Sequence, residues 1–223
     1  MGSAVARLAA ERGYMPVLGY LRDQDRASAL AAELNAPVVG GDIAEQAVRA
    51  RLLDAARGAG ELYGLAVFSG DPARVPLESA SLEDLLASMR ANYAGPVLMA
   101  RDFVAALGEQ DGSIVLTSTM QGVGVFAGST VYAAPKAALI HTAKILAKQW
   151  KVRVNVVAPG VNDAGMARQS VQSGKYSSFL ERGIIPRFGR PEDVARAVLF
   201  FLEPDNYITG QVLTIDGGLS LKM

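Results

Sequence analysis

The alternation of short apolar runs with longer helical segments constrains the fold of this chain more than any other feature. The clearest apolar runs cover residues 17–20, 62–70, 112–119 and 152–160. A strand with one face in water would carry polar residues at every second position, but these runs are apolar on both faces. Strands of this kind, each followed by a helix, predict a parallel sheet covered on both sides, which is a doubly wound α/β fold.

Further strands are expected at residues 36–43 and 210–218, and helices over residues 2–13, 25–34, 44–57, 81–107, 131–149 and 191–201. Asp23 or Asp25 is a suitable N-cap for the second helix, because a carboxylate can accept the free amides of the first turn. Pro96 predicts either a kink or a fresh start within residues 81–107. Ligands of such folds bind beyond the carboxyl ends of the strands.

Composition narrows the possible functions. The 223 residues, half of them apolar, suit one domain spanning residues 1–223. Lys plus Arg and Asp plus Glu are both 22, which argues against a nucleic-acid partner. The chain has no cysteine and one histidine, His141, so no metal site is expected. No apolar run reaches the ~18 residues of a membrane span and the first residues do not resemble a signal peptide, so we expect no membrane partner and a cytoplasmic location.

The segment TSTMQGVGVFAGSTVYAAPKAALI, residues 117–140, carries the strongest chemical signal. Tyr132 and Lys136 are four residues apart and share one face of a helix. A nearby ammonium favours the phenolate, so we expect Lys136 to lower the pKa of Tyr132 and make it a general acid for a carbonyl oxygen. Thr119 and Ser118 end a buried strand, where a hydroxyl can bind the same oxygen. Taken alone, the pair is a weak motif and fits a surface position on an amphipathic helix better.

With the strand before it and the segment NVVAPG after it, this region resembles the short-chain dehydrogenase/reductase family, nearest its 3-oxoacyl-acyl-carrier-protein reductase branch. The resemblance covers nearly the whole chain. It implies a Rossmann-like fold and an enzyme that reduces a carbonyl group with a nicotinamide cofactor. It implies a catalytic set of Tyr132, Lys136, Thr119 or Ser118, and Asn92. In the family this asparagine holds a proton-relay water. The substrate would be a small ketone or an acyl-carrier-bound 3-oxoacyl group.

The resemblance also implies where a cofactor binds. Asp42 and Ile43 match the pair that holds the adenine, and Pro159 and Gly160 match the turn beside the nicotinamide. Arg22 follows the second family strand and could hold a 2′-phosphate, so we expect NADP, with NAD as the alternative. The cofactor-binding residues expected in full are Gly2, Arg22, Asp42, Ile43, Gly70, Tyr132, Lys136, Pro159 and Gly160.

Some positions depart from the family pattern. Thr119 stands where the family has serine, and the segment after the fourth family strand reads VFSG, so only Gly70 remains of the usual Asn-Asn-Ala-Gly. Ala164 replaces a threonine that often follows the Pro-Gly turn. Pro135 removes an amide next to Lys136, so the helix is expected to start late or to kink. The polar segment 167–183 fits either a substrate lid or an ordinary surface region.

The first residues, GSAVARLAAERG, match the helix that follows the glycine-rich loop in the family, with Gly2 as the last loop glycine or a residue added in cloning. We therefore expect the usual first strand to be missing from the sheet, which would leave two central edges unpaired unless the halves close up or another segment fills the gap. Cofactor binding should then weaken.

The sequence leaves two competing hypotheses about function. One is an active reductase, assembled as a homodimer or homotetramer through residues 92–107 and 131–149. The other is a catalytically impaired protein that serves as a structural partner in a hetero-oligomer.

Overall fold

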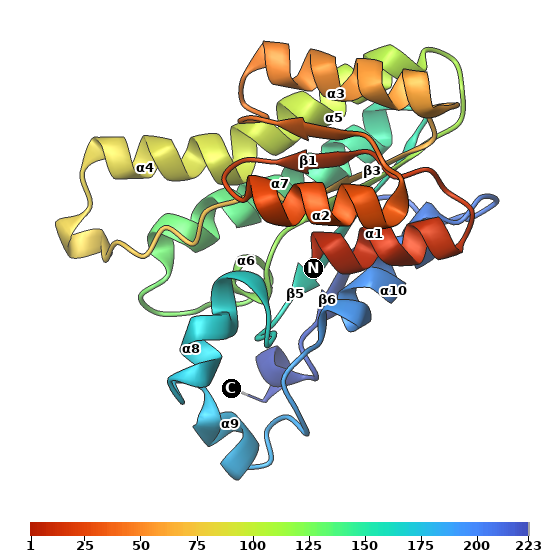
Figure 1. The fold of residues 1–223 in the computed structure, drawn as a ribbon. Coiled ribbons are helices and arrows are strands. Elements are labelled where there is room, and N and C mark those ends of the chain that lie inside the picture. The colour runs from red at the N-terminus through yellow and green to blue at the C-terminus, as the bar shows by residue number, and fades with distance from the viewer. Residues whose placement is uncertain (223) are drawn as a thin grey trace.

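The computed structural model describes residues 1–222, except the side chain of Met166, and helices and strands alternate along them (Figure 1). The strands are β1 (Leu18–Tyr20), β2 (Val38–Gly40), β3 (Gly64–Val67), β4 (Ser113–Thr117), β5 (Arg153–Pro159) and β6 (Val212–Ile215). The helices are α1 (Gly2–Glu11), α2 (Gln24–Leu34), α3 (Gln46–Ala59), α4 (Leu82–Met89), α5 (Gly95–Leu107), α6 (Met120–Val123), α7 (Thr130–Gln149), α8 (Arg168–Gln172), α9 (Ser177–Glu181) and α10 (Pro191–Leu202). The α/β class expected from the sequence is confirmed.

The strands form two parallel sheets, one of order β1-β2 and one of order β3-β4-β5-β6. In the larger sheet Leu65 pairs with Ile114, Ile114 with Val154, and Val157 with Leu213. Because all the strands run in the same direction, their carboxyl ends lie at one edge of each sheet. This edge is where the sequence predicted ligand binding.

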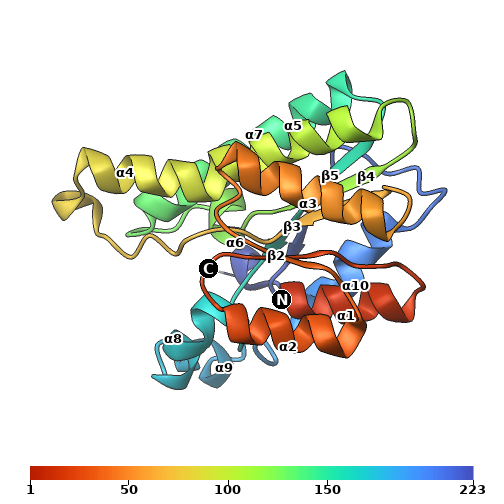
Figure 2. The same cartoon turned by 45° about the horizontal axis from the view of Figure 1, so that its top comes forward.

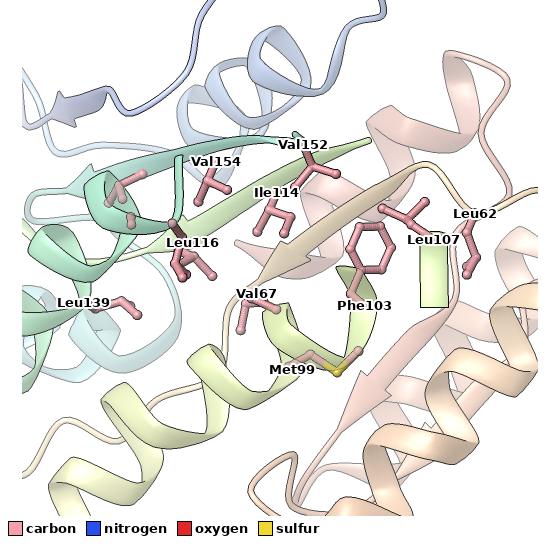
Figure 3. Packing of buried hydrophobic residues seen from close by; sticks show 14 of the residues in the cluster. Leu62, Val67, Met99, Phe103, Leu107, Ile114, Leu116, Leu139, Val152 and Val154 are labelled. Atoms are coloured by element: carbon pink, nitrogen blue, oxygen red, sulfur yellow. The ribbon is translucent and has the colours of Figure 1, made fainter. Parts of the chain in front are cut away.

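Helices cover both faces of the larger sheet, as expected for a doubly wound fold (Figures 1 and 2). On one face Met99 and Phe103 of α5 and Leu139 of α7 pack against Ile114 and Leu116, as Figure 3 shows. On the other face, α1 and α10 contribute Val5, Ala9, Val194 and Val198 against Val115 and Val157. The alternation of Ile114, Val115 and Leu116 between the two cores explains why β4 is apolar throughout.

The segment 81–107 forms two helices joined by a wider π-helical turn, Arg90–Ala94. Pro96 is the physical reason for this turn, because it has no amide to donate to the carbonyl of residue 92. The Gly95 amide bonds to the Arg90 carbonyl instead. Pro96 itself lies in the first turn of α5, so the expected fresh start occurs just before it.

Two other local expectations are resolved. Asp23, not Asp25, is the N-cap of α2, and its carboxylate accepts the Arg26 amide at 3.1 Å. The expected late start of the helix that carries Tyr132 is wrong, because α7 begins at Thr130 and continues through Pro135.

The two sheets remain separate. Within residues 1–222, no backbone hydrogen bond joins β1 to β3 and no strand lies between them, so the halves have not closed up. Side chains connect them instead. Arg7 of α1 donates two hydrogen bonds of 2.7 Å to Glu33 of α2, and Arg22 lies 3.5 Å from the carboxylate of Asp71.

None of the helices within residues 1–222 combines the length and apolar character needed to cross a membrane.

Arg49 ties α3 to α5 from a buried position. Its guanidinium donates to Asp102 at 2.6 Å and to the carbonyls of Ile43 and Ala44 at 2.8 and 2.9 Å. Burial raises the pKa of Asp102, but hydrogen bonds from Arg49 and Arg101 outweigh it and hold the pKa below its usual value. Asp102 therefore stays ionised beside a buried cation.

We expect Asp102→Ala to lower the free energy of unfolding by roughly 2–3 kcal/mol, because it leaves the Arg49 guanidinium buried without its counter-charge. Urea unfolding followed by circular dichroism measures this. Glu109→Ala, which breaks an exposed ion pair with Lys151, is the matched control and should leave the unfolding midpoint unchanged. Equal effects of the two substitutions would contradict the prediction.

Candidate active site

The carboxyl ends of β3, β4 and β5 bring together residues that are far apart in the sequence. Ser69 and Gly70 follow β3, Ser118 and Thr119 follow β4, and Gly160 follows β5. Helix α7 lies across this edge and presents Tyr132 and Lys136. The structure therefore brings Ser118, Thr119, Tyr132 and Lys136, four residues of the expected set, to the same edge of the sheet.

Lys136 is buried, with an exposed fraction of 2%. Its Nζ donates to the Thr117 carbonyl at 2.8 Å and to the Ser69 carbonyl at 3.5 Å. These two carbonyls end β4 and β3, so one ammonium joins helix α7 to both strands. Burial lowers the pKa of Lys136 to about 8, because the charged form loses solvation.

Tyr132 is half-buried, and the Thr119 side chain lies close enough to its hydroxyl to act on its pKa. Burial raises the pKa of Tyr132, and the neighbouring Thr119 side chain opposes this only in part. The expectation that Lys136 lowers the pKa of Tyr132 is therefore wrong for the free protein. The physical reason is that desolvation dominates at Tyr132, while the Lys136 ammonium is directed at the ends of the strands.

The structure distinguishes the two hydroxyls after β4. Ser118 Oγ donates to the Lys136 carbonyl at 2.9 Å, so its proton is used to hold α7. Thr119 is the N-cap of α6, and its hydroxyl also reaches Tyr132. Thr119 thus lies beside the reactive hydroxyl, and Ser118 holds the backbone behind it.

Asn92 lies in the π-helical turn and is fully buried. Its Oδ1 accepts the Asp71 amide at 3.1 Å, and its Nδ2 donates to the Asp71 carbonyl at 2.9 Å and to Ser88 Oγ at 3.1 Å. A Cβ built on Gly70 would lie 2.7 Å from Asn92 Oδ1 and 3.2 Å from Lys136 Nζ. Glycine is therefore needed at position 70 so that these two polar groups can approach the chain.

Three buried polar atoms at this edge have no hydrogen-bond partner among the described residues. They are Ser69 Oγ after β3, Thr117 Oγ1 at the end of β4 and Asn162 Oδ1 after β5. Buried polar groups in proteins are usually paired, so unpaired polar atoms near the ends of β3 and β4 suit a polar ligand at this edge, whereas Asn162 Oδ1 lies against Gly189. The residues present fit the nicotinamide half of a dinucleotide, which carries a carboxamide and ribose hydroxyls.

Gly160 follows β5 and lies against Asp216, which follows β6. A Cβ on Gly160 would lie 2.5 Å from the Asp216 Cβ, so a side chain there would force the two strand ends apart. Pro159 is the last residue of β5. Both therefore lie at the carboxyl end of β5.

The other cofactor residues expected from the sequence lie around the smaller sheet and α1. Asp42 accepts the Ala44 amide at 2.8 Å and a hydrogen bond from Arg90 at 3.1 Å, and Ile43 packs against the core after β2. Arg22 follows β1 and its side chain is 81% exposed. Gly2 begins α1 beside the Phe68 side chain, at the end of β3.

Sequence reasoning missed Ser88 and Asp71, which bind the side chain of Asn92. Pro135 was a signal for Ser88, because a proline inside a helix leaves a carbonyl that needs a donor from elsewhere. The sequence does not say which neighbouring helix supplies that donor. His141 is exposed on α7.

The chain was compared with protein families and curated relatives. A family model described as Enoyl-(Acyl carrier protein) reductase matches residues 1–220. The 3-oxoacyl-acyl-carrier-protein reductase of Bos taurus is 34% identical over 231 residues, which cover 100% of this chain and 94% of the bovine one. Carbonyl reductase family member 4 of Xenopus tropicalis is 33% identical over 229 residues, with the same shares of 100% and 94%.

A solved structure is also similar to this chain over nearly its whole length. The crystal structure of an oxidoreductase of the short chain dehydrogenase/reductase family from Burkholderia thailandensis aligns with a TM-score of 0.85 and 28% identity. The alignment covers 99% of this chain and 88% of that chain.

The buried ammonium predicts a pH-dependent stability. The pKa of Lys136 is about 8 in the folded protein and 10.5 in an ordinary lysine, so between these values the unfolded chain binds more protons. The free energy of unfolding of the wild type, measured against Lys136→Met, should therefore rise from pH 8 to pH 10, by at most about 1.4 kcal/mol per pH unit. Urea unfolding at several pH values measures the difference, and a difference independent of pH would contradict the prediction.

Proposed function

Because the chain belongs to the short-chain dehydrogenase/reductase superfamily, in its 3-oxoacyl-acyl-carrier-protein reductase-like branch, we propose that it uses NADPH to reduce the ketone of a 3-oxoacyl group. Membership makes it an NAD(P)-dependent oxidoreductase. The roles of the residues, the preference for NADPH and the substrate are the parts that we propose.

The observation that carries the proposal is the arrangement around the hydroxyl of Tyr132. This hydroxyl lies near the side chain of Thr119, which follows β4, and Lys136 is buried one helical turn away. If Tyr132 and Lys136 were a surface pair on an amphipathic helix, both side chains would be exposed to solvent. Here burial and polar contacts hold both groups at the edge where ligands of parallel sheets bind.

Tyr132 is proposed as the general acid that protonates the carbonyl oxygen. A raised pKa keeps the phenol protonated at neutral pH, so the proton is available for donation. Thr119 is proposed to hydrogen-bond the same oxygen and fix its position. When bound, NADPH supplies the hydride to the carbonyl carbon.

Lys136 has two proposed roles. With a pKa of about 8 it is mostly protonated at pH 7, so the group that holds α7 against the Thr117 and Ser69 carbonyls is a cation. We also assign it to the nicotinamide ribose, together with Gly70, Pro159 and Gly160 around that half of the cofactor. Asn92 is proposed to hold the water through which Tyr132 regains its proton.

The substrate class is proposed from the relatives, which include a 3-oxoacyl-acyl-carrier-protein reductase. The spacing of four between Tyr132 and Lys136 also favours a ketoreductase over an enoyl reductase, in which the lysine lies farther along the chain.

The adenosine half of NADPH is assigned to the smaller sheet. Asp42 and Ile43 are proposed to hold the adenine, and Arg22 to bind the 2′-phosphate with its exposed guanidinium. The first amides of α1, including that of Gly2, have no acceptor within the helix and suit the pyrophosphate.

A homo-oligomer fits the apolar side chains that are exposed on α4 and α7. Leu82, Leu86 and Met89 of α4 have exposed fractions of 64%, 58% and 38%, and Ile145 of α7 is 44% exposed. Pairing of such surfaces between two copies would remove them from water.

Tyr132→Phe tests the proposed chemistry. It removes the proton donor but keeps the ring, so we expect kcat for NADPH-dependent reduction of a 3-oxoacyl thioester to fall by about 10²–10⁴-fold. Consumption of NADPH, followed by absorbance, measures this. The fully exposed Tyr207 gives the matched control, and Tyr207→Phe should retain wild-type activity. A variant Tyr132→Phe with wild-type turnover would refute the proposal.

Arg22→Ala tests the choice of cofactor. Loss of a charge-assisted contact with the 2′-phosphate should weaken NADPH binding by roughly tenfold and leave NADH binding unchanged. Fluorescence titration of both cofactors measures this, with Arg12→Ala on the far end of α1 as a control. Equal losses for both cofactors would contradict the assignment of Arg22. Binding of neither cofactor by the wild type would instead support the alternative of a structural partner.

A further inference from the structure

Pro135, which lies between Tyr132 and Lys136 on α7, leaves one backbone carbonyl of the helix without its usual hydrogen-bond donor. In a regular helix the amide of residue 135 would donate to the carbonyl of Val131. Proline has no amide hydrogen, so this carbonyl needs another donor. Val131 directly precedes Tyr132, and therefore whatever pairs with its carbonyl also holds the backbone at the proposed general acid.

The donor comes from another helix. Ser88 of α4 donates from Oγ to the Val131 carbonyl at 2.6 Å, and both partners are buried. A short buried hydrogen bond to a carbonyl that Pro135 leaves open replaces the missing helical bond. It also joins α4 to the first turn of α7.

The same hydroxyl determines how Asn92 is oriented. A serine hydroxyl has one proton, and Ser88 uses it on Val131, so Oγ can act toward Asn92 only as an acceptor. Asn92 must then present its Nδ2, which donates to Ser88 Oγ at 3.1 Å. The Asp71 backbone favours the same orientation, because its amide donates to Oδ1 and its carbonyl accepts from Nδ2.

The orientation matters because Oδ1 is the side of the amide that lies near Gly70 and Lys136. A Cβ on Gly70 would touch both Asn92 Oδ1 and Lys136 Nζ, at 2.7 and 3.2 Å. One lone pair of Oδ1 accepts the Asp71 amide, and the other remains for a water or a ligand on that side.

We propose that Ser88 is a positioning residue that couples Asn92 to the backbone before Tyr132. Pro135 leaves the Val131 carbonyl without its helical donor, and this carbonyl accepts a hydrogen bond from Ser88 Oγ. Ser88 Oγ can then only accept a hydrogen bond from Asn92. The inference rests on the proposed function, since the coupling affects turnover only if Asn92 and Tyr132 take part in it.

Four variants test this coupling: Ser88→Ala, Pro135→Ala, the double variant, and Ser88→Thr. Ser88→Ala should lower kcat by roughly 5- to 30-fold, which corresponds to one or two buried hydrogen bonds, with little change in KM for NADPH. Its Tm should also fall. Ser88→Thr keeps the hydroxyl and should retain most of the activity.

The double variant distinguishes positioning from simple stabilisation. Pro135→Ala supplies the missing amide to Val131, so in the Ser88→Ala background it should restore Tm. It should not restore kcat, because Asn92 still lacks its acceptor. Joint recovery of Tm and kcat would overturn the positioning role, and an equal loss of Tm from Ser88→Ala with and without Pro135 would overturn the proposed bond.

Tyr132→Phe in the same assay separates the two levels of inference. If Tyr132→Phe is inactive and Ser88→Ala turns over like the wild type, only the role of Ser88 is refuted. If Tyr132→Phe is fully active, the proposed function fails and the role of Ser88 fails with it. The Tm cycle does not depend on turnover, so it tests the bond between Ser88 and Val131 in either case.

Discussion

The interaction on which the site depends is the pair of hydrogen bonds from the buried Lys136 ammonium to the ends of β3 and β4. A buried charge is costly, and it is tolerated here because two backbone carbonyls accept from it. These bonds fix the position of α7 against the edge of the sheet. Tyr132 is one turn earlier on the same helix, and so its hydroxyl arrives beside Thr119. The ammonium therefore has a structural task as well as the chemical one proposed for it.

Several buried polar atoms at this edge have no partner within the described part of the protein. Ser69 Oγ, Thr117 Oγ1 and Asn162 Oδ1 are buried without partners among the described residues, and each such atom costs about 1–3 kcal/mol. A ligand that satisfied them would recover that free energy on binding. The arrangement is consistent with a site whose polar groups are positioned in advance, at the expense of stability, by the strands that carry them.

Much of this could be predicted from the sequence because it depends on local spacing. The alternation of apolar runs predicted the α/β class, and the interval between Tyr132 and Lys136 placed both on one face of α7. Tertiary relations were not accessible in this way. The direction of the pKa of Tyr132 depends on how deeply the ring is buried, and spacing alone led to the wrong sign. Ser88 was missed because its partner lies on a helix whose packing against α4 no local pattern encodes.

The division of the strands into two sheets separates the two halves of the proposed cofactor site. Arg22 and Asp42 lie at the end of the smaller sheet, while Thr119, Tyr132 and Lys136 lie at the end of the larger one. No strand ladder between the described residues fixes one half against the other, so their relation depends on helix packing and on contacts such as Arg7 with Glu33 and Arg22 with Asp71. A dinucleotide that touched both sheets would bind only when the halves are correctly placed. Its binding free energy would then also stabilise that placement, since a ligand favours the state that it binds.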